Sequence, residues 1–202
     1  MCQENLDRIL LVSTGFFFMF AAFNTAQNLT TKVMEDNHFG KLGYYSLAVH
    51  YFFFGICSFI SAPIVTKLGP RLSMLFGATT YSIFIAAFIL PIERNDHPDN
   101  KTLEGMKGFI YGLLIFVAAL NGIGASIIWV AQGKYLSECA NERNKGLYMS
   151  IFQAFMQMCL IFCNVIGAFL IDSVPLTTFY IVLTGLVCLS ALLFLFLRKP
   201  IP

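Results

Sequence analysis

Long apolar runs separated by short polar segments make up the pattern of this 202-residue chain. A helix needs about 20 mainly apolar residues to cross the hydrocarbon core of a bilayer. Six stretches reach that length, and they run near residues 9–29, 44–65, 72–91, 108–131, 147–171 and 176–197. The pattern therefore predicts an all-α integral membrane protein, with six transmembrane helices forming a single domain over residues 1–202.

Composition supports the same fold class. The chain is 57% hydrophobic and only 12% charged, and it contains 22 phenylalanines. Soluble domains carry about 25% charged residues, so this much apolar surface is expected to face lipid. The formal charge of +2 is too small to indicate a nucleic-acid partner. The expected surroundings are the lipid bilayer and other integral membrane proteins.

An even number of spans places both termini on the same side of the membrane. With that side taken as the inner one, eight lysines and arginines fall inside and five fall outside, which accounts for all 13. This bias agrees with the positive-inside rule and predicts termini in the cytosol or an equivalent inner compartment. The sequons at Asn28 and Asn100 then lie outside, with Asn28 close to the membrane. The organelle is left open, with the mitochondrial inner membrane as one alternative.

No pattern typical of catalysis or of a bound cofactor is present. His38, His50 and His97 are scattered, without the paired spacing that would hold a metal. The run from Gly122 to Gly124 lacks the third glycine and the preceding strand of a dinucleotide site. Four of the six cysteines lie within apolar runs, where cysteine is commonly a small buried hydrophobe. The sequence predicts a protein that is not an enzyme and binds no cofactor or metal.

Seven polar residues fall within the predicted spans. They are Asn24, Gln27, His50, Asn121, Gln153, Gln157 and Asn164. Each costs free energy in lipid unless it finds a partner. They either line a cavity for a neutral or zwitterionic substrate, or form hydrogen bonds between helices and with partner subunits; the second alternative is favoured. No Asp, Glu, Lys or Arg lies deep in a span, so His50 is the candidate there for a proton relay. The alternative, a hydrogen-bonded core histidine, is favoured.

The fourth predicted span contains small residues at intervals of four. Gly108 and Gly112 form one pair, and Gly122 and Ser126 form another. Small residues at this spacing let two helix backbones approach closely. Close packing within the six-helix bundle is favoured at these positions, and contact with an outside partner is the alternative.

The same span ends in the sequence WVAQGKY, from Trp129 to Tyr135. Tryptophan and tyrosine are enriched where acyl chains meet headgroups, and lysine anchors the end of a helix. The order predicts that Trp129 and Tyr135 lie at the membrane interface and that Gln132 lies at its wet rim. Lys134 is then expected on the inner aqueous side.

The segment "GIGASIIWVAQGKYLSECANERNKGLYMSIFQ" resembles the fourth-to-fifth-helix region of the uncoordinated-93-like branch of the major facilitator superfamily. Further similarity comes from "FMFAAFNTAQN" in the first span and "KLGPRLSM" after the second, so that the resemblance covers nearly the whole chain. The residues that match the motifs are Trp129, Gln132, Gly133, Lys67, Gly69 and Arg71.

This resemblance implies the N-terminal half of a twelve-helix bundle, because the superfamily joins two similar halves around a substrate site. After its second helix, the superfamily has an aspartate that helps lock the transporter outward-open. Thr66 occupies that position here, so this means of gating is not expected.

Better-known members of the branch are channel-regulatory or receptor-escort proteins. The resemblance therefore implies a non-catalytic accessory or regulatory subunit of a larger membrane assembly. Two alternatives remain open. One is a small-molecule transporter formed by two identical six-helix halves, and the other is a transporter formed by pairing with a separate C-terminal half.

Overall fold

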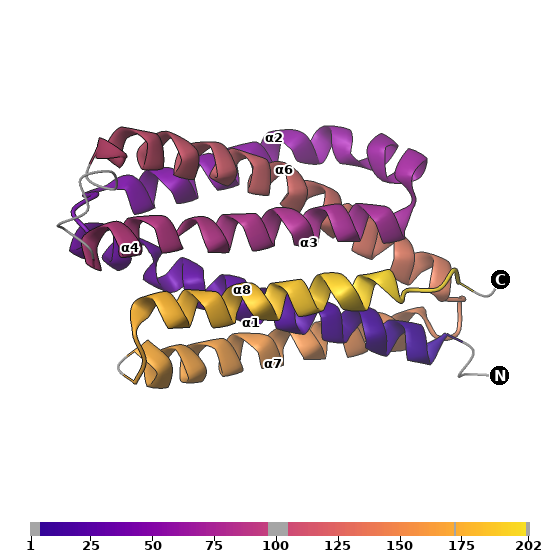
Figure 1. The fold of residues 1–202 in the computed structure, drawn as a ribbon. Coiled ribbons are helices and arrows are strands. Elements are labelled where there is room, and N and C mark those ends of the chain that lie inside the picture. Colours follow the sequence, from indigo (N-terminus) through magenta and orange to yellow (C-terminus); the bar gives the residue numbers. More distant parts are fainter. Residues whose placement is uncertain (1–4, 97–104, 172, 201–202) are drawn as a thin grey trace.

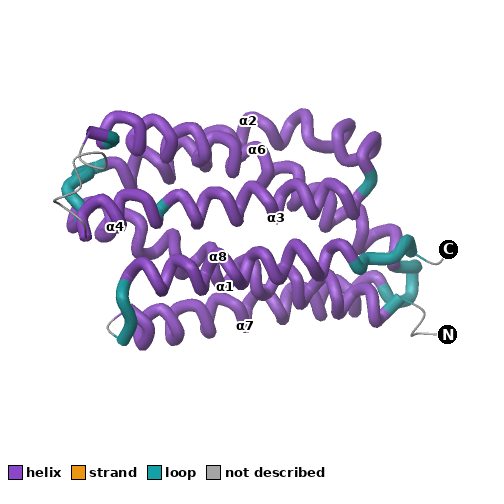
Figure 2. The backbone as a smooth tube through the Cα atoms, in the orientation of Figure 1, coloured by secondary structure: helices purple, strands orange, loops and turns teal. Residues whose placement is uncertain are grey.

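The computed structural model describes residues 5–96, 105–171 and 173–200 of the chain. Its helices are α1 Leu6–Asp36, α2 Leu42–Leu68, α3 Pro70–Ala87, α4 Ile89–Asp96, α6 Lys107–Cys139, α7 Lys145–Ile171 and α8 Leu176–Leu195. These described parts contain no strand (Figure 2). Six helical segments are long and apolar enough to cross a membrane, with α3 and α4 together making the third. The predicted all-α membrane fold with six spans is confirmed.

The third span is broken because of Pro91. A proline ring clashes with the carbonyl group four residues earlier and removes one backbone donor. For Pro91 that carbonyl belongs to Ala87, the last residue of α3. Helix α4 resumes at Ile89, which leaves Pro91 in the first turn, where a missing N–H is tolerated.

A single glycine connects α2 to α3. The Gly69 backbone has φ 80° and ψ 155°, a combination that is essentially restricted to glycine. Its N–H donates to the Val65 carbonyl at 2.9 Å and closes α2, and Pro70 then begins α3. The turn explains why the "KLGPRL" stretch needs glycine at this position.

The helices form two groups of three (Figure 1). Helices α2, α6 and α3 make one group and α8, α1 and α7 the other. Within the first group α6 packs on α2 and α3, and within the second α1 packs on α7 and α8. The packing of α3 on α8 joins the groups. The two groups thus share one arrangement, in which a central helix packs on the other two.

The start of α1 and the end of α8 lie at the same end of the bundle (Figure 1). An even number of spans requires this. Which side of the membrane that end occupies remains a prediction of the basic-residue count. The sequon at Asn100 lies outside the described residues.

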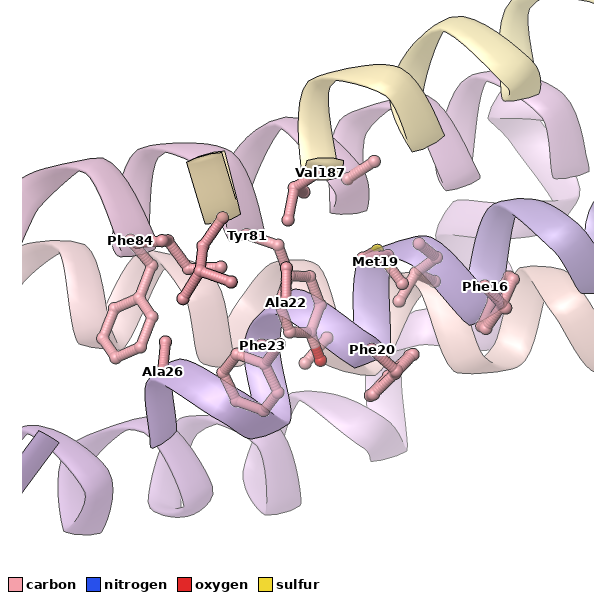
Figure 3. Packing of buried hydrophobic residues seen from close by; sticks show 14 of the residues in the cluster. Phe16, Met19, Phe20, Ala22, Phe23, Ala26, Tyr81, Phe84 and Val187 are labelled. Atoms are coloured by element: carbon pink, nitrogen blue, oxygen red, sulfur yellow. The ribbon is translucent and has the colours of Figure 1, made fainter. Parts of the chain in front are cut away.

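The hydrophobic core is centred on α1 (Figure 3). The ring of Phe23 meets that of Tyr81 in α3 edge-on, with centroids 4.7 Å apart. Phe16 reaches Phe194 of α8 at 5.6 Å. About 61% of the span in α1 is buried within the chain, against 17% for α2 and 22% for α7. Helices α2 and α7 therefore offer the largest share of their surfaces to lipid or to another protein.

Candidate functional site: the intramembrane polar groups

A buried polar cluster joins α2, α3 and α6. Asn121 Nδ2 lies 3.3 Å from His50 Nδ1, and Asn121 Oδ1 lies 3.4 Å from Thr80 Oγ1. The Thr80 hydroxyl also donates to the Gly77 carbonyl at 2.7 Å. Asn121 is completely buried and His50 is 2% exposed. The cluster holds three helices together and is closed to a substrate.

Aromatic rings surround His50 and separate it from the surface. The Tyr51 ring lies 5.0 Å away between centroids, Phe23 lies 5.5 Å away and Phe84 lies 5.9 Å away. These contacts come from α1, α2 and α3. They agree with the interpretation of His50 as a core histidine whose partner is Asn121.

Replacing Asn121 with leucine is expected to lower the free energy of unfolding by about 1–2 kcal/mol, because the buried His50 ring would lose its partner. Removing both partners with His50→Leu/Asn121→Leu should cost less than the sum of the two single changes. Titration with sodium dodecyl sulfate in mixed micelles would measure all three variants. Strict additivity would contradict a direct bond between the two side chains.

A second set of polar contacts links α1 to its neighbours. Gln27 Nε2 donates to the Tyr51 hydroxyl of α2 at 2.7 Å. Asn28 Nδ2 donates to Asn164 Oδ1 of α7 at 3.2 Å. Asn24 forms a side-chain hydrogen bond with Cys159 of α7. These side-chain amides of the first span thus form contacts between helices.

Three amides follow one side of α7. Gln153, Gln157 and Asn164 are spaced by four and seven residues, so they lie along one flank of the helix. All three are exposed on the six-helix bundle. Asn164 accepts the bond from Asn28, whereas Gln153 and Gln157 have no hydrogen-bond partner within the described residues. We refer to Gln153, Gln157 and Asn164 as the α7 amide strip.

Two of the four small residues of α6 contact a neighbouring helix, and the other two do not. A Cβ atom at Gly122 would meet the His50 carbonyl oxygen and other atoms of α2, and Ser126 Oγ accepts a bond from Ser61 at 2.8 Å. At Gly108 and Gly112, a Cβ atom would meet nothing within 4 Å. Gly108 and Gly112 are exposed, whereas Ile110 and Leu114 in the same stretch are fully buried, so the two glycines lie on the face of α6 that points away from the bundle. The favoured expectation of packing within the bundle does not hold at these two positions, and contact with an outside partner there stays a prediction.

Trp129 has a packing role that its sequence context does not indicate. Its ring is half-buried and packs against Phe20 and Phe16 of α1, with centroids 5.1 and 5.8 Å apart. Helix α6 continues past Trp129 as far as Cys139. The tryptophan is thus a packing residue between α1 and α6, and its position at the membrane interface stays a prediction.

The other motif residues gather near the end of the bundle. Gln132 is 6% exposed, which contradicts the expected wet rim, and Gly133 has open space around it. Lys67 is exposed. The Arg71 guanidinium donates to the Leu195 carbonyl, which links the start of α3 to the end of α8.

Several contacts at this end were missed from the sequence. The Tyr135 hydroxyl donates to the Arg198 carbonyl at 2.8 Å. Asn5 Nδ2 donates to the Cys139 carbonyl at 3.0 Å, so the start of α1 is attached to the end of α6. Asn5 lies outside the apolar runs, and no local pattern distinguishes it from a loop residue.

Nothing in the described residues resembles a metal or disulfide centre. Groups of three or more His, Cys, Asp or Glu side chains able to hold a metal do not occur there. The described cysteines, Cys57, Cys139, Cys159, Cys163 and Cys188, are all free.

Comparison with known proteins agrees with this arrangement. The family profile described as Major Facilitator Superfamily matches residues 11–202. "UNC93-like protein MFSD11" of Xenopus laevis is 30% identical over 207 residues, which cover 98% of this chain and 42% of that protein. "UNC93-like protein 3" of Arabidopsis thaliana is 30% identical over 132 residues, 65% of this chain and 24% of that protein.

A third relative carries a functional name. "Putative potassium channel regulatory protein unc-93" of Caenorhabditis elegans is 29% identical over 137 residues, covering 67% of this chain and 16% of that protein. The chain thus spans less than half the length of these relatives. No solved structure matches it significantly. The resemblance to the uncoordinated-93-like branch is confirmed.

Proposed function

Because the chain belongs to the major facilitator superfamily and its relatives are UNC93-like membrane proteins, we propose that it is a non-catalytic accessory or regulatory component of a larger membrane protein assembly. Its partners would be other integral membrane proteins. One relative's name, a putative potassium channel regulatory protein, supports this class of role.

The observation that carries the proposal is the α7 amide strip. Gln153 and Gln157 project from a helix whose neighbouring exposed residues include Met158 and Ile161, at 50% and 66% exposure. An amide that faces hydrocarbon without a partner loses its hydrogen bonds to water and gains none. Another helical unit that covers this flank of α7 would supply the missing partners.

The test is co-purification from the native membrane in a mild detergent, followed by native mass spectrometry. The unaltered chain is expected to retain a defined set of other membrane proteins. Replacing Gln153 and Gln157 with leucine should reduce that retention about tenfold or more, because each interhelical hydrogen bond contributes about 0.6–1.7 kcal/mol.

The matched control changes two exposed apolar residues on another helix. Ile181→Leu and Leu192→Ile in α8 alter side-chain shape but add or remove no polar group. The control should keep its partners, and the leucine variant should keep its stability. If the chain purifies as a monomer, or if both variants retain the same partners, the proposal is wrong.

Transport is the second candidate, favoured by superfamily membership and by the half-buried amides of Asn24 and Gln27 on α1. In that case the second half of the bundle would be an identical copy or another six-helix unit. The Gln153→Leu/Gln157→Leu variant would then lose solute uptake in vesicles while its assembly stayed intact. If the variant lost its partners while its solute uptake stayed unchanged, transport through this site would be ruled out and the regulatory function would be supported.

A further inference from the structure

A pocket of about 920 Å³ opens at the end of the bundle that holds the start of α1 and the end of α8. Its walls are the turn between α2 and α3, the last part of α6, and the segment from Leu195 to Pro200. The bond from Tyr135 to the Arg198 carbonyl joins the last part of α6 to the segment from Leu195 to Pro200, and the contact of Arg71 with the Leu195 carbonyl joins the start of α3 to the same segment. The pocket is thus built from contacts between distant parts of the chain.

The charged groups of the pocket favour an anion. Arg71, Arg198 and Lys199 line it, against the single carboxylate of Glu138. That carboxylate lies 3.9 Å from the ammonium group of Lys134 on the same helix, which offsets its charge. Helix α3 also begins here without a side-chain cap, so the positive end of its dipole adds to the field.

Four other lining residues are apolar and exposed. Leu68, Leu72, Leu195 and Phe196 are 48%, 55%, 39% and 71% exposed. These residues lie where the helices leave the apolar spans, next to the cationic groups. A soluble anion would contact the cations and leave these apolar side chains uncovered, whereas a phospholipid presents a phosphate and acyl chains at the same depth.

We infer that this pocket binds the headgroup of an anionic phospholipid. Its phosphate lies between Arg71, Arg198 and Lys199, and its acyl chains run along Leu72 and Phe196. A zwitterionic headgroup such as phosphatidylcholine binds less well, because its own ammonium group already neutralises the phosphate. The site lies outside the α7 amide strip and does not depend on the function proposed for that strip.

The test is titration of the detergent-solubilised chain with phosphatidylglycerol, with bound lipid counted by native mass spectrometry. Each basic residue near a membrane surface contributes about fivefold to the binding of an anionic lipid. Replacing Arg71, Arg198 and Lys199 with glutamine should therefore weaken binding on the order of 100-fold. The double variant Arg198→Gln/Lys199→Gln keeps the Arg71 contact with Leu195 and should lose about 25-fold.

The control removes the same charge from the opposite end of the bundle. Lys32, Lys41 and Lys107 are exposed there, and their replacement with glutamine should leave phosphatidylglycerol binding unchanged. Equal weakening in control and pocket variants would overturn the inference, as would equal affinity for phosphatidylcholine. Displacement of the lipid by inorganic phosphate at comparable concentration would show a site for free anions instead. Loss of a co-purifying protein from the pocket variants, with lipid binding retained, would assign the surface to a protein partner.

Discussion

Replacing Gly122 with alanine is expected to lower the free energy of unfolding by about 2–3 kcal/mol, the upper part of the range for overpacking. The added Cβ atom would meet the His50 carbonyl oxygen, the Phe53 Cβ atom at 2.9 Å and the Phe54 backbone nitrogen at 3.0 Å. Two of these three are backbone atoms of α2, which cannot move away by changing a rotamer. Helices α2 and α6 would have to separate, and the neighbouring bond between His50 and Asn121 would lengthen with them.

Gly112 in the same helix is the matched control. A Cβ atom there meets nothing within 4 Å, so alanine adds helix propensity without a clash. Gly112→Ala should therefore raise the free energy of unfolding by about 0.5–1 kcal/mol. Titration with sodium dodecyl sulfate in mixed micelles would measure both variants. The two changes should have opposite signs, and a stabilising Gly122→Ala would contradict the close approach of α2 and α6.

Replacing Phe16 with alanine should cost about 2–4 kcal/mol. Its ring is fully buried and lies 5.2 Å from Phe152, 5.6 Å from Phe194 and 5.8 Å from Trp129, measured between centroids. The change would leave a cavity where α1, α6, α7 and α8 meet. The expected loss lies somewhat below the range for soluble cores, because lipid also solvates phenylalanine in the unfolded state and mainly the packing energy is lost.

The control for Phe16 is Phe116, which is 64% exposed on α6. Phe116→Ala removes the same atoms from a surface that faces the surroundings of the bundle, so it should change the free energy of unfolding by less than about 0.5 kcal/mol. Thermal unfolding in a mild detergent, followed by the fluorescence of Trp129, would compare the two variants. Equal losses in both would mean that the aromatic cluster around Phe16 does not hold the four helices together.

The six spans could be predicted because bilayer thickness sets the length of an apolar helix. The ends of the helices could be predicted less well from the sequence. Helix α1 continues to Asp36 and α6 to Cys139, because a helix satisfies its own backbone groups in water as well as in lipid. Proline chemistry explains the interruption before Pro91, although hydropathy through that region is continuous.

Which side of each helix meets a neighbour could not be predicted from the pattern. Helices α2 and α8 are apolar nearly all round, so periodicity does not distinguish a buried face from a lipid-facing one. Gly108 and Gly122 belong to similar small-residue series, yet α2 approaches only Gly122. Trp129 occupies a sequence context typical of an interface but packs against Phe20 in the bundle.

Hydropathy, length and motif residues therefore determined that this is a six-span membrane protein of the major facilitator type, since those properties follow from transfer of side chains into lipid. Tertiary structure decided the roles of individual polar groups. His50 found a partner in Asn121, 71 positions along the chain. Gln153 and Gln157 remained exposed, and Arg71 came to line the same pocket as Arg198. The physical reason is that each apolar residue favours lipid by itself, whatever its neighbours are. Hydrogen bonds and clusters of charged groups form only where the fold brings distant helices together.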